Sequence, residues 1–317
     1  PSYSATVPDF KMPQVWRSSL AFDKKFSTSY TFTLEGIFTK LINNVYFRNA
    51  NLGLQNGILN APGDGRPYYT PRLNDNISLM TVMDNVNKGF SAVFTAQVQR
   101  SFSKNWAGSI AYTYTFANDL NIGTSDRASS SWSTNNIVDN PNDPELSYSN
   151  FSIPHRVIAN FSYKFNYLKD NMATTVGLYY SGSSQERYHF RYGSDVNGDG
   201  QTNDLIYIPA DPSQITFVEG FKVGNKTYTA QQQKDAFFAF VDNNQYLKKH
   251  KGQYMDRNGA LLPWVNSLDM RVLQDFSFNA GKRKHTFQFS IDVVNLLNLI
   301  DNNWGIKYSY NFGSFSD

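Results

Sequence analysis

The residue types and spacing best suited to chemistry occur between positions 195 and 204, in the run DVNGDGQTND. Oxygen-bearing side chains at its first, third and fifth positions, with glycine at the sixth, match the first half of an EF-hand-type loop. Ca²⁺ prefers such hard oxygen ligands, and glycine allows the sharp turn between them. The pattern predicts a Ca²⁺ site, and its candidate ligands are Asp195, Asn197, Asp199, Gln201 and Asp204.

The second half of this run differs from an EF-hand. An EF-hand loop has a bidentate glutamate at position twelve, where this chain has Ile206. Asp204 is the acidic residue that could replace that glutamate with a different geometry. The alternative interpretation is a turn without metal, in which aspartate and asparagine side chains accept hydrogen bonds from nearby backbone N–H groups.

The remaining reactive residue types form no recognisable catalytic set. There is no Gly-x-Ser-x-Gly, His-Glu-x-x-His or phosphate-binding loop, so we expect no enzymatic activity. Metal-ligand spacing is also absent among the four histidines, which are His155, His189, His250 and His285. Some charged residues on neighbouring strands are better explained as ion pairs lining an enclosed space than as a catalytic pair; they are Asp269, Arg271, Asp275 and Asp292.

The composition of the chain excludes several classes of protein and favours others. Aromatic residues make up 16% of the 317 residues, which favours strands and suits a membrane interface. No run approaches the roughly 18 consecutive apolar residues of a spanning helix. There is no cysteine, so disulfides and thiolate metal sites are excluded. The net charge of +3 is scattered rather than gathered in a basic stripe, so we expect no nucleic-acid partner.

Long runs of period-two alternation predict β-strands with one apolar and one polar face. In one of them, Val157, Ala159 and Phe161 alternate with Asn160 and Ser162. Most runs reach the roughly 9–11 residues that a tilted strand needs to cross a bilayer. The clearest runs are residues 90–98, 106–116, 157–165, 172–180, 268–278 and 287–293.

The connections between these runs alternate strictly between short and long. Short turns follow Asp23, Ser101, Phe165 and Asn279. In an up-and-down barrel, successive connections lie at opposite ends, so this rhythm places all short turns on one side. Transmembrane barrels have short periplasmic turns and long extracellular loops, whereas long loops are uncommon in compact soluble domains. The predicted long loops are residues 48–88, 118–153, 182–263 and 295–305.

The sequence therefore predicts an all-β, antiparallel up-and-down transmembrane barrel domain over residues 1–317. About nine strands can be counted, the last near residues 306–312. Bacterial barrels normally have an even number of strands and no open edge, so an odd count favours part of a larger barrel. A short helix is expected at residues 230–241 in the longest loop, with Thr229 as its N-cap.

Segments spread over nearly the whole chain resemble the barrel of Oar-like TonB-dependent receptors. Their order and spacing carry the resemblance more than any one of them. They are FKMPQVWR (10–17), LE (34–35), PHRV (154–157), DVNGDG (195–200), NDLIYIP (203–209), GQY (252–254), RNG (257–259), PWVN (263–266), LDMR (268–271), DVVNLLN (292–298) and NWG (303–305).

The resemblance implies a C-terminal barrel portion of an outer-membrane transporter. Such a barrel has about 22 strands, encloses an N-terminal plug domain and is driven by TonB through an N-terminal box. Neither plug nor box is visible in this sequence, and the final strand of the family usually ends in an aromatic residue, whereas this chain ends at Asp317. Both differences are expected of a partial chain, and the plug and the TonB-binding segment are then expected in missing N-terminal chain.

Three functions remain open from the sequence. The first is TonB-dependent uptake of an unidentified peptide or glycan across the outer membrane of a Gram-negative cell. The second is a non-transporting surface barrel that acts as an adhesin or assembly partner, and the third is a secreted, soluble β-rich binding protein. The expected partners are outer-membrane lipid, lipopolysaccharide and a surface lipoprotein or other outer-membrane protein. The basic run at 246–251 could meet lipopolysaccharide phosphates or form a solvated face.

Overall fold

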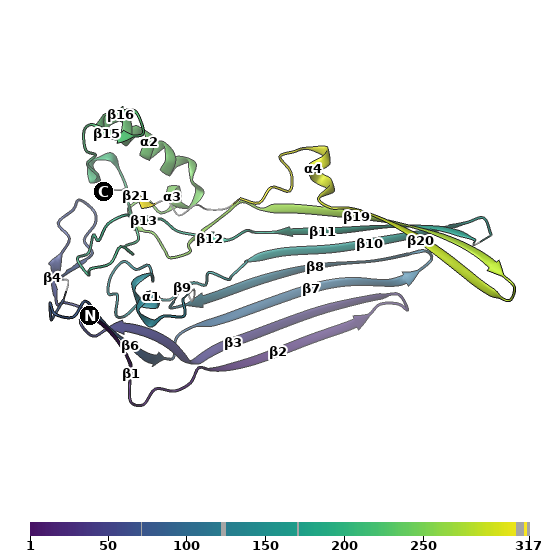
Figure 1. The fold of residues 1–317 in the computed structure, drawn as a ribbon, viewed down its shortest axis with the longest axis horizontal. Helices are drawn as coiled ribbons and strands as arrows, with labels where there is room; N and C mark the ends of the chain where they lie inside the picture. Colours follow the sequence, from purple (N-terminus) through teal and green to yellow (C-terminus); the bar gives the residue numbers. More distant parts are fainter. Residues whose placement is uncertain (71, 122–124, 170, 309–313, 316–317) are drawn as a thin grey trace.

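The computed structural model describes residues 1–70, 72–121, 125–169, 171–308 and 314–315 (Figure 1). Long strands joined in an 11-stranded sheet make up its body. These are β2 (Gln14–Lys25), β3 (Tyr30–Asn49), β7 (Phe90–Ser103), β8 (Trp106–Asp119), β10 (His155–Tyr167), β11 (Met172–Ser183), β19 (Val265–Ala280) and β20 (Arg283–Val293).

The register of the sheet joins the apolar positions of neighbouring strands into continuous rows. One row crosses five strands at Trp106, Tyr163, Val176, Val272 and Ile291. Because successive residues of a strand point to opposite faces, the residues next to this row form a row on the other face. That adjacent row is small or charged; it contains Ala107, Ser162, Gly177, Arg271 and Asp292. The alternation read from the sequence thus becomes one apolar and one polar face.

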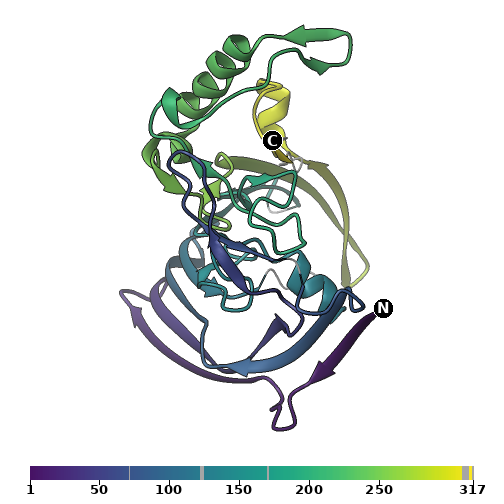
Figure 2. The same ribbon diagram turned by 90° about the vertical axis from the view of Figure 1, so that its left-hand side faces the viewer.

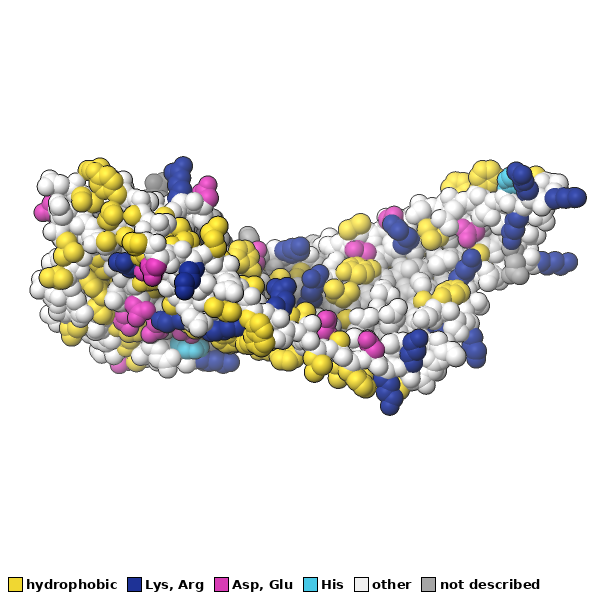
Figure 3. Space-filling model, turned by 90° about the horizontal axis from the view of Figure 1, so that it is seen from below, with side chains coloured by type: hydrophobic (Ala, Val, Ile, Leu, Met, Phe, Trp, Pro, Cys, Tyr) yellow, Lys and Arg dark blue, Asp and Glu magenta, His cyan; other side chains and the backbone are white. Residues whose placement is uncertain are grey.

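The two ends of the sheet differ as the sequence predicts. The four hairpins β2–β3, β7–β8, β10–β11 and β19–β20 turn at one end, and the long connections gather at the other (Figure 1). In two of these turns, adjacent residues adopt positive φ, as tight hairpins require; they are Lys104 with Asn105 and Leu168 with Lys169. Lys and Arg side chains gather toward the turn end (Figure 3).

The sheet curves into part of a barrel (Figure 2). In the described part of the chain its outer long strands, β2 and β20, pair only with β3 and β19, so the barrel is not closed. The predicted loop 48–88 also contributes to the sheet. Besides the short hairpin β4 (Gln55–Ile58) and β5 (Pro67–Tyr69), it contains β6 (Leu79–Val86), which pairs with the end of β3. The short β1 (Ser2–Thr6) lies parallel to β6, the one departure from antiparallel pairing in this sheet as described.

The C-terminal run differs in its described part from the ninth strand counted in the sequence. The structure gives residues 306–308 no strand conformation, and residues 309–312 lie outside the described residues. After β20 the chain forms the short helix α4 (Leu296–Ile300), which lies against β19 and occupies part of the predicted loop 295–305.

The other long connections fold into what we call the loop layer, residues 50–78, 120–154 and 184–264 as far as they are described. Its predicted helix is confirmed as α2 (Ala230–Asn243), where Thr229 and Gln232 form a capping box. Its other elements are α1 (Ala128–Ser133), β9 (Ser147–Tyr148), β12 (Arg187–Tyr188), β13 (Arg191–Tyr192), β14 (Tyr207–Ile208), η1 (Pro212–Gln214), β15 (Phe221–Val223), β16 (Lys226–Tyr228), α3 (Gln245–Lys249), β17 (Gln253–Tyr254) and β18 (Ala260–Leu261), while β21 (Ser314–Phe315) pairs with β13.

Buried hydrophobic packing is concentrated in the loop layer. One described cluster joins Ile206, Ile208, Val241 and Leu247 with neighbouring residues, and a second is centred on Trp132. By contrast, large apolar side chains of the long strands stay exposed, for example 62–65% for Phe287, Phe289 and Ile291. The strands therefore do not enclose the core of a stacked sandwich. No helix in the described part of the chain is long and apolar enough to cross a membrane.

Candidate functional site

A buried arginine ties together three segments of the loop layer. Arg66 follows β4 and is fully buried; its guanidinium contacts Asp64 at 2.9 Å and Asp204 at 3.2 Å, and donates to the main-chain oxygen of Leu205 at 2.8 Å. The ring of Tyr254 lies 5.3 Å from the guanidinium carbon, and its hydroxyl donates to Asp64. Because each partner comes from a different part of the chain, this cluster fixes the β4–β5 hairpin against residues 204–205 and β17.

The predicted Ca²⁺ loop lies beside this cluster. Asp195 accepts hydrogen bonds from the N–H groups of Gly198, Asp199 and Gly200 at 2.7–3.1 Å. Asn197 accepts from the Asp199 N–H at 2.9 Å. These are the bonds expected of an Asx-type turn, and they bring residues 195–200 into a compact loop. Gly198 and Gly200 have φ of 77° and 88°, which side-chain-bearing residues rarely adopt.

The five predicted ligands do not occupy equivalent places. Asp195, Asn197 and Asp199 converge through the bonds just described, whereas Gln201 enters them only through its N–H, which donates to Asp199 at 2.7 Å. Asp204 contacts Arg66 through one carboxylate oxygen and accepts from the Val196 N–H at 2.9 Å through the other. Among the described residues, no three His, Cys, Asp or Glu side chains form a group able to hold a metal ion. Ca²⁺ binding stays a prediction.

Burial makes the carboxylates of this loop unusually poor acids. Desolvation, followed by the nearby charge of Asp204, raises the pKa of Asp199 to about 7. Desolvation also raises the pKa of Asp204 to about 6, although the Val196 N–H and Arg66 act in the opposite direction. Both side chains are almost completely inaccessible, at 1% and 0%. Burial therefore makes the ionised form of both side chains less favourable than it would be in water.

One cavity in the loop layer, which we call the larger cavity, has a volume of about 1030 Å³. It lies between the segment before β5, the strand pair β15–β16 and helix α2. Most of its lining is apolar, with Ile215, Phe217, Phe221 and Val223 among the contributors, and Gln232 and Gln233 add polar groups from α2. A cavity of this size and character is suited to a ligand with apolar groups and a few hydrogen-bonding atoms.

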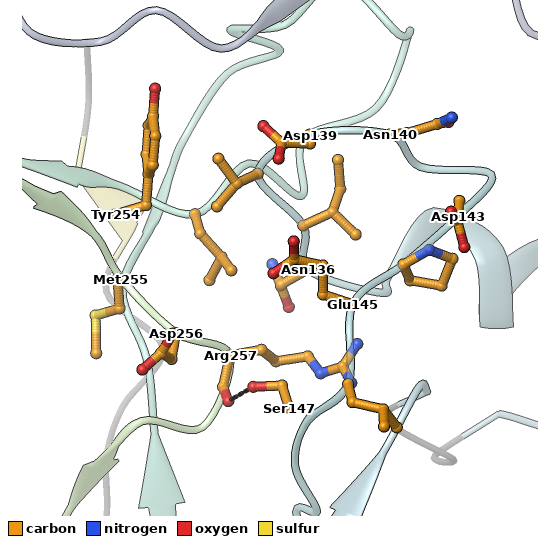
Figure 4. Close-up of a pocket in the computed structure, with 15 residues that line it drawn as sticks. Asn136, Asp139, Asn140, Asp143, Glu145, Ser147, Tyr254, Met255, Asp256 and Arg257 are labelled. Carbon is orange, nitrogen blue, oxygen red and sulfur yellow. Dashed lines mark hydrogen bonds between the residues drawn. The ribbon is translucent and has the colours of Figure 1, made fainter. Parts of the chain in front are cut away.

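The smaller cavity, about 270 Å³, is polar and acidic (Figure 4). Residues 136–147 form one wall and residues 254–257 the other, joined by a hydrogen bond from the Ser147 hydroxyl to the main-chain oxygen of Arg257. Its carboxylates are solvent-exposed, so they suit weak contacts with a cationic group rather than a deep binding site. They are Asp139, Asp143, Glu145 and Asp256.

Arg257 lines the smaller cavity, and His189 contacts Asn136, another residue of its lining. The buried guanidinium of Arg257 donates to the main-chain oxygens of Asp119 and Leu120, which end and follow β8, and so anchors the loop layer to the sheet. His189 bridges Asn258 at 3.0 Å and Asn136 at 2.9 Å. Burial, with Arg257 and Arg191 nearby, lowers the pKa of His189 to about 4, although its bond to Asn258 acts in the opposite direction.

Three of the four charged residues expected to pair across strands are found in ion pairs, and Asp269 is not. Arg271 and Asp292 face each other in register and form an ion pair. Asp275 lies 3.7 Å from Lys164, and Asp269 accepts the Asn295 N–H. Outside the sheet, part of the basic run 246–251 is structural, since Leu247 is buried and Lys251 pairs with Asp242 at 2.6 Å.

Two residues of this region, Arg66 and Asn203, were not predicted from the sequence as site residues. Arg66 lies in an ordinary Gly-Arg-Pro segment, 138 residues from Asp204, and nothing local marks it as buried. Asn203 belongs to the predicted loop, yet its side-chain oxygen is buried and has no hydrogen-bond partner. The ninth position of an EF-hand loop, which Asn203 occupies, is the signal that could have identified it.

A curved sheet with one apolar face, short turns at one end and a folded loop layer at the other defines an outer-membrane β-barrel. The family model described as "Outer membrane beta barrel domain" matches residues 1–315, and the chain belongs to this family. It is therefore an integral protein of the outer membrane.

Solved structures of transporters resemble this chain at low identity. The outer membrane transporter YddB from Escherichia coli is 11% identical with a TM-score of 0.41, and the match covers 92% of this chain and 30% of that one. P. aeruginosa FpvA, solved with an iron-bound heterologous pyoverdine, is 8% identical with a TM-score of 0.25, covering 89% and 32%. The chain thus spans about a third of the length of these transporters. No curated protein matches it.

Proposed function

We propose that this chain is the barrel portion of a TonB-dependent transporter whose loop layer captures a peptide with apolar side chains. The observation that carries the proposal is the cavity of about 1030 Å³ in the loop layer. Phe221 and Val223 line it and remain 40% and 57% exposed. Exposed apolar groups in a concave surface are typical of ligand sites. The Nε2 atom of Gln232 and the Oε1 atom of Gln233, whose partner amide atoms bond within the loop layer, suit the main chain of a peptide.

The energy source in this proposal is TonB, acting through a plug domain outside this chain. Its support is the resemblance of an ordered set of segments in this chain to Oar-like receptors. Transport then requires rearrangement of the plug and no covalent chemistry in the barrel, so the lack of enzymatic activity remains a prediction of the same account.

Uptake measurements in the source cell test the proposal. A strain lacking the full-length protein is complemented with the wild type or with a Phe221→Ser, Val223→Ser variant, and uptake of a radiolabelled tryptic peptide digest is compared with that of mixed oligosaccharides. We expect peptide uptake to require TonB and to be lost when Phe221 and Val223 are both replaced by serine. Lys222→Ser with Lys226→Ser is the matched control, since neither lysine lines the cavity.

Each other outcome has a definite meaning. Uptake of oligosaccharides alone would assign a glycan substrate and overturn the peptide proposal. Uptake that persists after TonB depletion would overturn the energy source. If the strain lacking the protein takes up peptides normally but no longer attaches to surfaces, the second function, a non-transporting surface barrel, is identified instead.

A further inference from the structure

The loop of residues 195–204 contains one buried side-chain oxygen that has no hydrogen-bond partner among the described residues. It belongs to Asn203. Asn203 is 2% exposed, and its amide nitrogen donates to the main-chain oxygen of Asn135 at 2.9 Å. Its Oδ1 atom, turned away from that contact by the geometry of the amide, has no hydrogen-bond partner. A buried acceptor without a partner is destabilising unless an ion or water reaches it.

Two of the three carboxylates in the same loop have no ion-pair partner among the described residues. Arg66 is shared between Asp64 and Asp204. No ion pair in the described residues joins Asp195 or Asp199 to a basic side chain. One oxygen of Asp199 has only a long contact, 3.4 Å from the amide nitrogen of Asn197. Burying carboxylates is costly unless a cation compensates them.

These atoms stand at the positions that an EF-hand-type loop uses for Ca²⁺. Positions one, three and five provide side-chain oxygens, position seven provides a main-chain oxygen, and position nine contributes a ligand that often acts through water. In this chain those positions are Asp195, Asn197, Asp199, Gln201 and Asn203, respectively. The donor set consists of oxygen alone, with no sulfur or imidazole, and such a set favours Ca²⁺ over the softer transition metals.

We propose that residues 195–203 bind one Ca²⁺ ion, with the Asn203 side chain and the Gln201 main-chain oxygen completing a set begun by Asp195, Asn197 and Asp199. In this arrangement Asp204 holds Arg66 and is not a ligand. The two acidic ligands balance the charge of the ion, and the two amide oxygens add neutral ligands.

The bound ion has a structural consequence for the loop layer. The main-chain oxygen of Asn197 accepts the N–H of Tyr69 in β5 at 2.7 Å, and the Asn203 main-chain oxygen accepts the Ile137 N–H at 3.2 Å. Asp195 and Val196 also line the larger cavity. Ca²⁺ therefore holds together the β4–β5 hairpin, one wall of the smaller cavity and one wall of the larger one, independently of what the barrel transports.

Titration of the purified full-length protein in detergent tests the site. After treatment with a chelator, CaCl₂ is added in a calorimeter, and MgCl₂ serves as the comparison ion. We expect one saturable Ca²⁺ site, with a dissociation constant on the order of 10⁻⁴–10⁻³ M as in extracellular modules. Asp199→Asn and Asn203→Ala should each weaken it at least tenfold. The control is Asp235→Asn, which removes an exposed carboxylate from α2.

A second measurement needs no variant and covers the case in which a substitution unfolds the loop. Hydrogen exchange of residues 195–206 in the wild-type protein should slow on addition of Ca²⁺ and remain unchanged with Mg²⁺. The proposal is overturned by an unchanged exchange rate at 10 mM Ca²⁺ (roughly ten times the weakest expected dissociation constant), or by equal Ca²⁺ binding in wild type and Asp199→Asn. These experiments do not measure peptide uptake, so their outcome tests the Ca²⁺ site independently of the transport proposal.

Discussion

At the scale of single residues, long-range polar contacts organise the loop layer. Arg66 is the centre of these contacts because it compensates Asp64 and Asp204, both of which are buried with it. Removal of one member of such a buried group leaves uncompensated charge in a dry environment. The sequence indicates the turn-forming residues of the loop, whose bonds are local, and gives no indication of Arg66, whose partners become neighbours only after folding.

Replacement of Arg66 by alanine should open the loop layer while leaving the sheet intact. Breaking a buried pair costs about 3–5 kcal/mol, equivalent to a rise of roughly a hundredfold or more in the population of the open form. Limited proteolysis should show faster cleavage near residues 60–70 and 195–205. Arg72→Ala, an exposed arginine of the same segment, is the control. Equal cleavage of both variants would contradict the assigned role.

His189 should make the loop layer sensitive to mild acid. Its folded pKa of about 4 lies below its ordinary value of 6.5, so the unfolded loop takes up a proton first as the pH falls. Stability is therefore complete above pH 6.5 and is lost as the pH falls toward 4, by up to about 3 kcal/mol. Arg257 and Arg191 reinforce this direction.

The measurement is hydrogen exchange of residues 135–137 and 257–259 between pH 7 and 5, corrected for the intrinsic pH dependence of exchange. His189→Gln should remove most of the acid sensitivity, because an amide can replace the two hydrogen bonds without titrating. The same acid sensitivity in both proteins would assign it to another group.

At the scale of elements, alternation in the sequence predicts the long strands well. The runs at residues 157–165 and 287–293 are confirmed in β10 and β20, because alternation reflects a local property, the two faces of a strand. β6 was missed inside a predicted loop, since Leu79–Val86 is defined by its pairing with the far end of β3. Helix α2 was predicted because its capping signal at Thr229 is also local.

Loss of this cap should loosen the start of α2. Thr229 accepts the Gln232 N–H at 3.2 Å, and Gln232 returns a bond to the Thr229 N–H at 3.0 Å. Thr229→Ala should cost about 1 kcal/mol, seen as roughly fivefold faster exchange in the first turn of the helix. Thr227→Ala, in the exposed hairpin, should have no such effect. Unchanged exchange in α2 would show that tertiary packing alone defines its start.

At the scale of the whole molecule, the chain consists of a sheet, whose apolar face contacts lipid, and a loop layer that lies in water. The described clusters of buried hydrophobic residues lie largely in the loop layer, whereas the long strands carry apolar rows that no second sheet covers. The placement of short turns at one end could be predicted from connection lengths. The two cavities could not, because their walls come from segments far apart in the sequence.

The central claim is that the apolar face of the sheet contacts lipid and the polar face borders an enclosed aqueous space. The chain has no cysteine, so single cysteines can be introduced at residues 159–164 of β10, in the middle of the sheet, and spin-labelled in the full-length protein in lipid bilayers. The account predicts that labels at Ala159, Phe161 and Tyr163 collide with oxygen dissolved in the bilayer, and that labels at Asn160, Ser162 and Lys164 collide with a water-soluble nickel chelate. Accessibility without this alternation, or labels on the apolar face shielded from both reagents, would contradict it.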